Sequence, residues 1–310
     1  MTAQWTTRQT WVAAAIGVVV IALLVLIFGR EGNPKAIAKG FAHLAEADSF
    51  HTQTELVINL PTLLRGRERP FTKTTIRLEG DVARAEDRTP EFTGTFYLEA
   101  RGRGNVFFAD GQGRILRERV LFNLDNLPVF LNPTGSLVKR WTKVEAPLLT
   151  TANGEQVKEA LEGIAAKASP AGKESIPLDG AQGKQGEQLA RFTIALSEED
   201  EAALANVFRQ AASGNRALHV LARLLDANRV AELVVWTDGR QLRQIQAHFV
   251  RPLEDGSEFD FARLNLRFTD YGKEVAIDAP ETKRFVRPDV FARIFGGGNV
   301  EEVKAEVEEQ

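Results

Sequence analysis

Hydrophobic and polar residues alternate with a period of two along several stretches of the chain. Leu56 and Ile58, for example, fall on one face of an extended segment, and Glu55 falls on the other. Half-buried antiparallel strands with a charged outer face give this pattern. In the first half of the chain it occurs at residues 52–60, 72–80 and 92–101. Residues 105–109 and 114–122 are predicted as two further strands, with a turn at Asp110-Gly111 between them. The alternation therefore predicts an antiparallel meander.

The last third of the chain predicts a β-hairpin. Residues 230–237 and 241–250 are strand-like, and Asp238 and Gly239 lie between them. An Asp-Gly pair between two such runs is a strong hairpin signal. Further strands are predicted at residues 259–269 and 274–277, and Pro280 is expected to end the sheet.

Apolar residues recur at helical spacing in shorter segments. Ile37, Phe41 and Leu44 form one stripe, and Ser197 followed by acidic residues is a typical helix start. The predicted helices cover residues 36–47, 151–164, 217–225 and a segment that begins after Ser197. Residues 165–188 are rich in small and polar side chains, so a flexible insertion is expected there.

One uncharged run, which begins at Trp11 and ends at Gly29, differs from all other segments. As a helix it would be about 28 Å long, close to the hydrocarbon thickness of a bilayer. No small-residue cleavage site follows it, so a signal anchor with a single membrane span is predicted. The predicted organisation is a short segment at 1–10, the span at 11–29, a linker at 30–35, one domain at 36–296 with the insertion near 165–188, and an acidic tail at 297–310.

Composition excludes several kinds of chemistry. The formal net charge of −3 over 310 residues gives no basic footprint for nucleic acid. The absence of cysteine excludes disulfides, thiolate metal sites, cysteine nucleophiles and a lipid-modified cysteine. The four histidines, His43, His51, His219 and His248, have no metal-ligand spacing, and no nucleotide-binding or hydrolase motif occurs. We therefore expect no cofactor, no metal and no enzymatic activity, and we expect Asp255, Glu258 and Asp260 to form a solvated acidic cluster.

Two segments carry a resemblance to a known family. The first is VVWTDGRQLRQIQAHFV followed by LNLRFTDYGKEVAIDAP, which ends at Pro280. The second is an amphipathic helix that runs into ADSFHTQTEL. Both segments resemble the LppX/LprG family of lipoproteins, and the second also resembles the wider LolA/RseB-like fold. The chain departs from these lipoproteins in having an apolar run in place of the lipidated cysteine.

This resemblance implies a fold of the α+β class. After the transmembrane helix it implies a strongly curved antiparallel sheet, an incomplete barrel, with helices over its concave side and an apolar cavity between them. Members of the family carry acyl chains or lipidated proteins. The resemblance therefore implies a cell-membrane protein with an extracytoplasmic C-terminal domain, although the flanking charges alone favour the opposite orientation.

The inward strand positions are the candidate ligand residues. They are Leu56, Ile58, Ile76, Leu78, Phe96, Leu98, Ile245, Ala247, Phe249, Leu264, Leu266 and Phe268. Alternation alone is compatible with a solid core against covering helices and with a ligand-sized cavity. Two functions follow: binding of a lipid or other apolar ligand, or a sensor and protein-interaction module with a filled core and an envelope protein as its partner.

Overall fold

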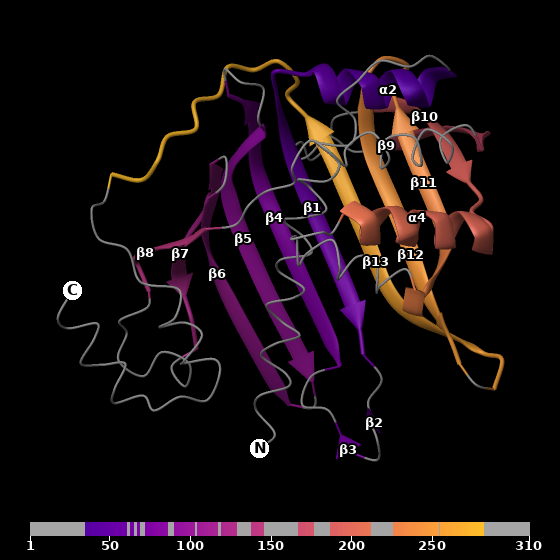
Figure 1. Cartoon of the computed structure of the whole chain (residues 1–310), viewed down its shortest axis with the longest axis horizontal. Coiled ribbons are helices and arrows are strands. Elements are labelled where there is room, and N and C mark those ends of the chain that lie inside the picture. Colours follow the sequence, from indigo (N-terminus) through magenta and orange to yellow (C-terminus); the bar gives the residue numbers. More distant parts are fainter. Residues whose placement is uncertain are drawn as a thin grey trace.

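The computed structural model describes residues 35–60, 63–64, 67–68, 72–85, 90–102, 104–116, 119–128, 138–145, 167–176, 187–211, 226–253 and 255–281 (Figure 1). These residues form two helices and a long antiparallel sheet. The elements are α2 (Lys35–Glu46), β1 (Ser49–Asn59), β2 (Leu63–Leu64), β3 (Arg67–Glu68), β4 (Lys73–Arg84), β5 (Pro90–Gly102), β6 (Asn105–Leu116), β7 (Arg119–Asn126), β8 (Trp141–Glu145), β9 (Ala168–Ile176), β10 (Glu187–Ile194), α4 (Glu198–Ala211), β11 (Arg229–Thr237), β12 (Leu242–Pro252) and β13 (Glu258–Thr269).

The main sheet has 11 strands in the order β8-β7-β6-β5-β4-β1-β13-β12-β11-β10-β9. The first strand therefore lies near the centre, where β1 pairs with β4 on one side and with β13 on the other. Almost every other neighbour is a consecutive strand, which is the meander that the alternation predicts. Strands β2 and β3 form a separate two-stranded ladder between β1 and β4.

The predicted α+β class is wrong for the described residues, which are nearly all antiparallel sheet. Helix α2 contacts β11 and β12, and α4 contacts β11, so these two helices do not cover the whole concave side of the sheet. The structure places strand β9 in a stretch without alternation, because this strand is exposed on both faces for most of its length. A two-sided polar strand has no period-two signal, and its sequence is typical of a loop.

Neither helix within the described residues has the length and hydropathy that crossing a bilayer requires. The run from Trp11 to Gly29, on which the predicted membrane span rests, lies outside the described residues. The same is true of the predicted helices at 151–164 and 217–225 and of the acidic tail at 297–310.

Three local predictions are also wrong. The predicted strand at 114–122 is divided between β6, which ends at Leu116, and β7, which begins at Arg119 and pairs back onto β6. Strand β6 continues straight through Asp110 and Gly111, where a turn was expected, because these residues pair with β5 on one side and β7 on the other. Residues 274–277 form no strand. Their segment instead crosses the ends of neighbouring strands, as the yellow trace in Figure 1 shows, and the carbonyl of Asp278 accepts a hydrogen bond from Arg114.

Helix α2 closes one end of the sheet. Ile37 and Leu44 are buried, and Gly40 packs against the backbone of Leu242, where a Cβ atom would approach the Leu242 nitrogen to 3.2 Å. A second contact is made by the ring of Tyr271, which lies edge-on to His43 at 5.5 Å. Close approach at Gly40 therefore fixes the apolar stripe of α2 over the start of β12.

Candidate functional site

The pairing registers place all twelve candidate ligand residues on one face of the sheet, the apolar face. One row across the strands joins Leu56 to Ile76 and Leu98 on one side, and to Leu264 and Ala247 on the other. The next row towards α2 contains Leu78, Phe96, Leu266 and Ile245, and the remaining candidates are Ile58, Phe249 and Phe268. The sequence prediction of a shared face is confirmed by these registers, whereas their role as a ligand site stays a prediction.

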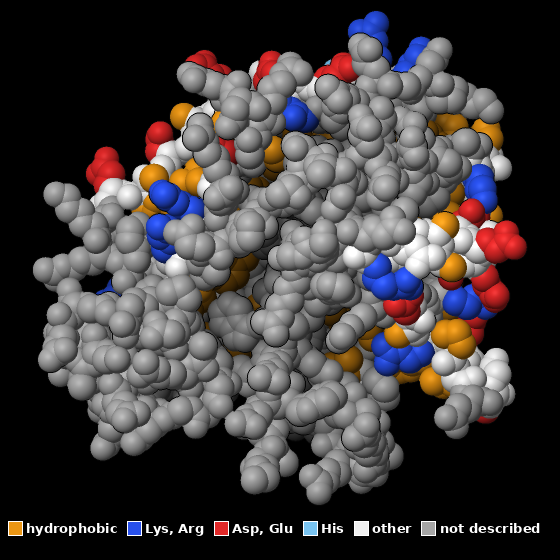
Figure 2. Space-filling view, viewed as in Figure 1, with side chains coloured by type: hydrophobic (Ala, Val, Ile, Leu, Met, Phe, Trp, Pro, Cys, Tyr) orange, Lys and Arg blue, Asp and Glu red, His pale blue; other side chains and the backbone are white. Residues whose placement is uncertain are grey.

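The apolar face is buried unevenly. Nine of the twelve residues are buried, and Phe96, Phe249 and Leu264 are half-buried. The three half-buried residues lie diagonally across five neighbouring strands from β5 to β12. Because adjacent strands are about 4.8 Å apart, this diagonal covers about 19 Å in the direction across the strands. Figure 2 shows hydrophobic side chains in a recess near the centre of the face that it presents.

The end of the apolar face away from α2 contains residues that the sequence analysis missed. Leu56, Ile58, Ile76, Leu98, Phe261 and Ala262 form a buried cluster there, with Leu60, Phe107, Phe249, Phe259 and Leu264 packed against it. Phe261 was missed because it does not lie at an alternating position of β13. The register shifts between Phe249 and Val250, which leaves Phe261 as an extra residue in β13. Phe107 was missed because its exposed neighbours Val106 and Phe108 are also hydrophobic, so this short strand has no alternation.

Two buried hydroxyl groups interrupt the apolar face. Thr52 and Thr54 on β1 are 0% and 3% exposed, and within the described part of the chain neither Oγ1 atom has a hydrogen-bond partner. A buried polar group without a partner is uncommon in native proteins. Thr52 lies opposite Gly80 and Phe268. The two hydroxyls do not end the apolar face, because a further buried apolar row, at the end towards α2, contains Phe50 and Val82.

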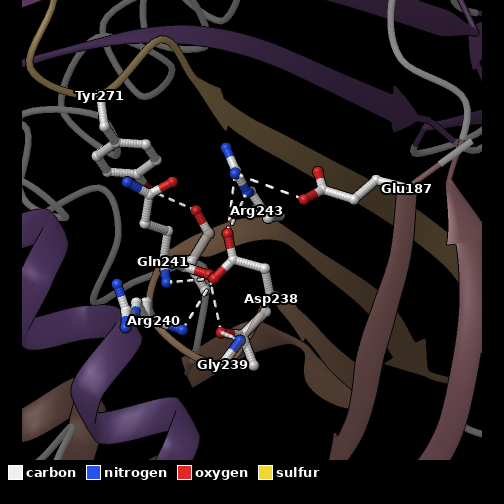
Figure 3. Close-up of polar contacts among 9 residues, drawn as sticks. Glu187, Asp238, Gly239, Arg240, Gln241, Arg243 and Tyr271 are labelled. Atoms are coloured by element: carbon white, nitrogen blue, oxygen red, sulfur yellow. Dashed lines mark hydrogen bonds and ion pairs between the residues drawn. The ribbon is translucent and has the colours of Figure 1, made fainter.

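The turn between β11 and β12 forms a polar network beside this end of the apolar face (Figure 3). Asp238 Oδ1 accepts hydrogen bonds from the backbone N–H groups of Arg240 and Gln241 at 2.8 and 2.7 Å. Its Oδ2 accepts from Arg243 Nε at 3.0 Å, and Arg243 also lies over the ring of Tyr271. The hydroxyl of Tyr271 donates to the carbonyl of Leu242. The turn is thereby tied to the segment after β13.

The environment shifts two pKa values in this network. Burial raises the pKa of Asp238, but the hydrogen bonds from Gln241 and Arg240 and the charge of Arg243 outweigh burial and hold this pKa below its ordinary value. Burial raises the pKa of the Tyr271 hydroxyl far above its ordinary value, so it is a neutral donor at physiological pH. These shifts fit a structural junction, since Arg243, the charged partner of Asp238, also forms an ion pair with Glu187 at the start of β10 and so ties the turn to a third strand.

The opposite face of the sheet, the polar face, carries ion pairs. Glu55 accepts a hydrogen bond from Arg77 at 2.8 Å in a groove of about 290 Å³ that also involves Gln53, Glu79 and Arg267. His51 and His248 each contact a carboxylate at 2.9 Å, Asp81 and Asp260 respectively. The polar face therefore uses its charges in pairs across neighbouring strands.

The predicted acidic cluster is divided among separate partners. Asp255 accepts from Ser257, Glu258 pairs with Arg229, and Asp260 pairs with His248 and Arg263. Among the described residues no group of three or more His, Asp or Glu side chains is arranged to hold a metal ion. His43 lies against Tyr271, and His219 lies outside the described residues.

Comparisons with known proteins give two similar solved structures. LprF from Mycobacterium bovis is 12% identical over 84% of this chain and 97% of its own, with a TM-score of 0.40. A β-barrel-like protein from Brucella abortus with a domain of unknown function is 9% identical over 72% of this chain and 99% of its own, with a TM-score of 0.17. No family model and no curated protein matches the chain.

Proposed function

We propose that the apolar face binds the hydrocarbon part of a lipid or another apolar molecule, without chemical change to it. The observation that carries this proposal is the diagonal of half-buried side chains, Phe96, Leu264 and Phe249, on a face whose other candidate residues are buried. Covering solvent-exposed apolar side chains with hydrocarbon lowers the free energy of the system, because it removes apolar surface from water. The proposal places the domain outside the cytoplasm, as the sequence resemblance implies.

The magnitude of this gain is sufficient for useful affinity. Each methylene group that a bound chain buries contributes about 0.8 kcal/mol. A contact of eight methylene groups would then contribute about 6 kcal/mol before the entropy of ordering the chain is subtracted. Shape and burial alone can therefore support binding, and no polar constellation is required for it.

A filled core is the second candidate, and the burial of nine of the twelve candidate residues favours it. In that case the domain would act through protein contacts. In the first candidate a lipid contacts the half-buried residues of the apolar face, and in the second a protein does. A test that identifies the molecule in direct contact with this face therefore distinguishes the two candidates.

The test is photo-crosslinking of the full-length chain in cells. A photoreactive amino acid replaces Phe96, Phe249 or Leu264 on the apolar face, one at a time. The matched controls replace Tyr97, His248 or Asn265, each of which is adjacent to one of these residues on the same strand and faces the opposite side. After irradiation and purification, mass spectrometry identifies the adduct.

We expect lipid adducts at the three apolar-face positions and at least tenfold less at their neighbours. Equal lipid labelling on both faces would show non-specific contact with membranes and would contradict the proposal. Protein adducts without lipid at Phe96, Phe249 and Leu264 would support the filled-core candidate instead.

A further inference from the structure

Strand β6 is longer than the neighbour that covers its outer edge. On one side it pairs with β5 along nearly its whole length, from Asn105 to Ile115. On the other side β7 pairs only with residues from Asp110 to Leu116. Among the described residues no strand pairs with the outer edge of 106–109, and Figure 1 shows β7 and β8 beside only one part of β6.

The backbone groups of Val106 and Phe108 point towards this open edge. The Arg84 N–H donates to the Asp48 carbonyl at 2.9 Å, in line with the β1–β4 register. Hydrogen-bonded pairs alternate with non-hydrogen-bonded pairs in an antiparallel ladder, and the pairing is continuous from β1 through β4 and β5 to β6. The even-numbered residues of β4 therefore bond β1, and its odd-numbered residues bond β5. In the same way the even-numbered residues of β5 bond β6, so that the odd-numbered residues of β6 bond β5. The even-numbered residues of β6 therefore present their N–H and C=O groups outwards.

The side chains at this edge are apolar and exposed. Val106 is 64% exposed and Phe108 is 47% exposed, and both lie on the polar face. The ring of Phe107, on the apolar face, packs against the buried cluster. No charged residue occurs between positions 105 and 109.

The last strand at the other end of the sheet is protected in the usual way. Strand β9 carries Pro170, which has no N–H group, and the charged, exposed Lys173 and Glu174. Proline and lysine on an edge strand prevent pairing with another chain. Residues 105–109 carry neither device, and an unprotected apolar edge is a template for strand addition.

We propose that a second copy of this chain pairs with this edge, antiparallel, about a two-fold axis at Phe107. In this register Val106 lies opposite Phe108 of the partner subunit, and the same pair recurs on the other side of the axis. The outward groups of these residues form four backbone hydrogen bonds, because a two-fold antiparallel pairing matches each outward residue with another outward residue. Aromatic and β-branched side chains are favourable cross-strand partners, and no like charges meet.

The sequence favours a second copy over a foreign peptide because the segment is complementary to itself in this register. The pairing covers only five residues of each chain, well below the area of a permanent interface. The dimer is therefore weak, and its population depends on protein concentration.

The natural absence of cysteine allows a direct test by disulfide crosslinking of the full-length chain. At the two-fold axis a non-hydrogen-bonded pair has Cα atoms about 4.5 Å apart, within the range of a disulfide. We expect F107C to give a covalent dimer on oxidation. The matched control A109C lies on the same strand and face, but its two copies would be about 14 Å apart, so it gives none.

A second pair of variants checks the register without disturbing the half-buried ring of Phe107. Copies of V106C and F108C with different tags are co-expressed, and we expect them to crosslink to each other more than either does to itself. Adding V106K and F108K to F107C places like charges opposite each other and reduces crosslinking at least tenfold. Adding V106K and F108E instead places opposite charges together and retains it.

The proposal is overturned if neither F107C alone nor V106C with F108C crosslinks. It is also overturned if A109C crosslinks as well as F107C, or if the two lysines have no effect. Crosslinking of F107C to a different protein would identify a foreign strand as the occupant of this edge and would likewise overturn it.

Discussion

Gly80 on β4 lies directly opposite Gly94 on β5, and neither position has space for a side chain. A Cβ atom on Gly80 would lie 2.2 Å from the carbonyl oxygen of Thr93, and one on Gly94 would lie 2.2 Å from that of Glu79. The ring of Phe92 lies over both positions, 2.9 Å from the first of these Cβ sites and 2.7 Å from the second. Glycine in the interior of a strand commonly marks a bend or a close approach. The glycine pair therefore allows Phe92 to pack flat on the sheet beyond the candidate ligand rows.

Alanine at Gly80 or Gly94 should destabilise the fold. The added methyl group meets backbone atoms that cannot move without opening the β4–β5 ladder, and overpacking of this kind costs about 1–3 kcal/mol. Gly113 is the matched control, because it lies in the same row and on the same face with its nearest atom 3.9 Å from the Cβ site. Urea unfolding should show a loss for G80A and G94A and little change for G113A. Equal effects of all three would show that glycine flexibility, and not close packing, is what matters.

Much of this sheet is encoded locally, and the alternation predicts it for that reason. Leu56, Ile76 and Leu98 come from different strands, yet each lies at an alternating position whose face is fixed by the pleat. The registers that bring these residues into one row depend on pairing between distant segments, which no local pattern specifies. The bulge that brings in Phe261 and the polar edge strand β9 have no periodic signal at all. The sequence therefore predicts which residues share the apolar face of the candidate site. It does not predict how deeply each residue is buried or which residues lie at the two ends of that face.

Valine at Thr52 should leave the fold equally stable or stabilise it by about 1 kcal/mol. The hydroxyl of Thr52 is fully buried and has no partner within the described residues, and an unsatisfied buried group costs about 1–3 kcal/mol. Valine has nearly the same shape without the hydroxyl. Urea unfolding of T52V against the unmodified chain measures the difference, with T72V as a control at a half-buried position. A loss of more than 1 kcal/mol for T52V alone would show that the hydroxyl has a partner.

Stability should depend on the charge of Asp238 at neutral pH and not in acid. The pKa of this carboxyl is below its ordinary value of 3.8 in the folded chain, so the charged form stabilises the fold. This contribution is complete above the ordinary pKa and is lost as the pH falls through the lower folded pKa. D238N should therefore lower the free energy of unfolding by about 1 kcal/mol at pH 7, and the difference should shrink below pH 3.

Thermal unfolding followed by circular dichroism at pH 7 and pH 2.5 measures this difference. The control D255N changes a fully exposed carboxyl whose hydrogen bonds come from Ser257 in the loop between β12 and β13. It should have a smaller effect at pH 7 than D238N. If D238N is equally destabilised at both pH values, its effect comes from shape and not from charge.

The link between α4 and β11 should depend on one carboxylate. Glu201 is 8% exposed, and its Oε1 atom accepts a hydrogen bond from the Val230 N–H at 2.7 Å. Removing this acceptor leaves the Val230 N–H at the start of β11 without its partner, and a hydrogen bond to a charged group contributes about 1.5–3 kcal/mol. Glu199 is a matched control, because it lies in the same first turn of α4 but is exposed.

Since both residues favour the helix N-terminus by charge, the difference between E201A and E199A isolates the hydrogen bond. E201A should lower the free energy of unfolding by about 2 kcal/mol, and E199A by less than about 0.5 kcal/mol. Hydrogen exchange should also become faster at the Val230 amide in E201A only. Unchanged protection of Val230 in E201A would mean that α4 and β11 stay in register without this bond. The packing of α4 against β11 would then depend on the buried side chains Leu204 and Ala205 instead.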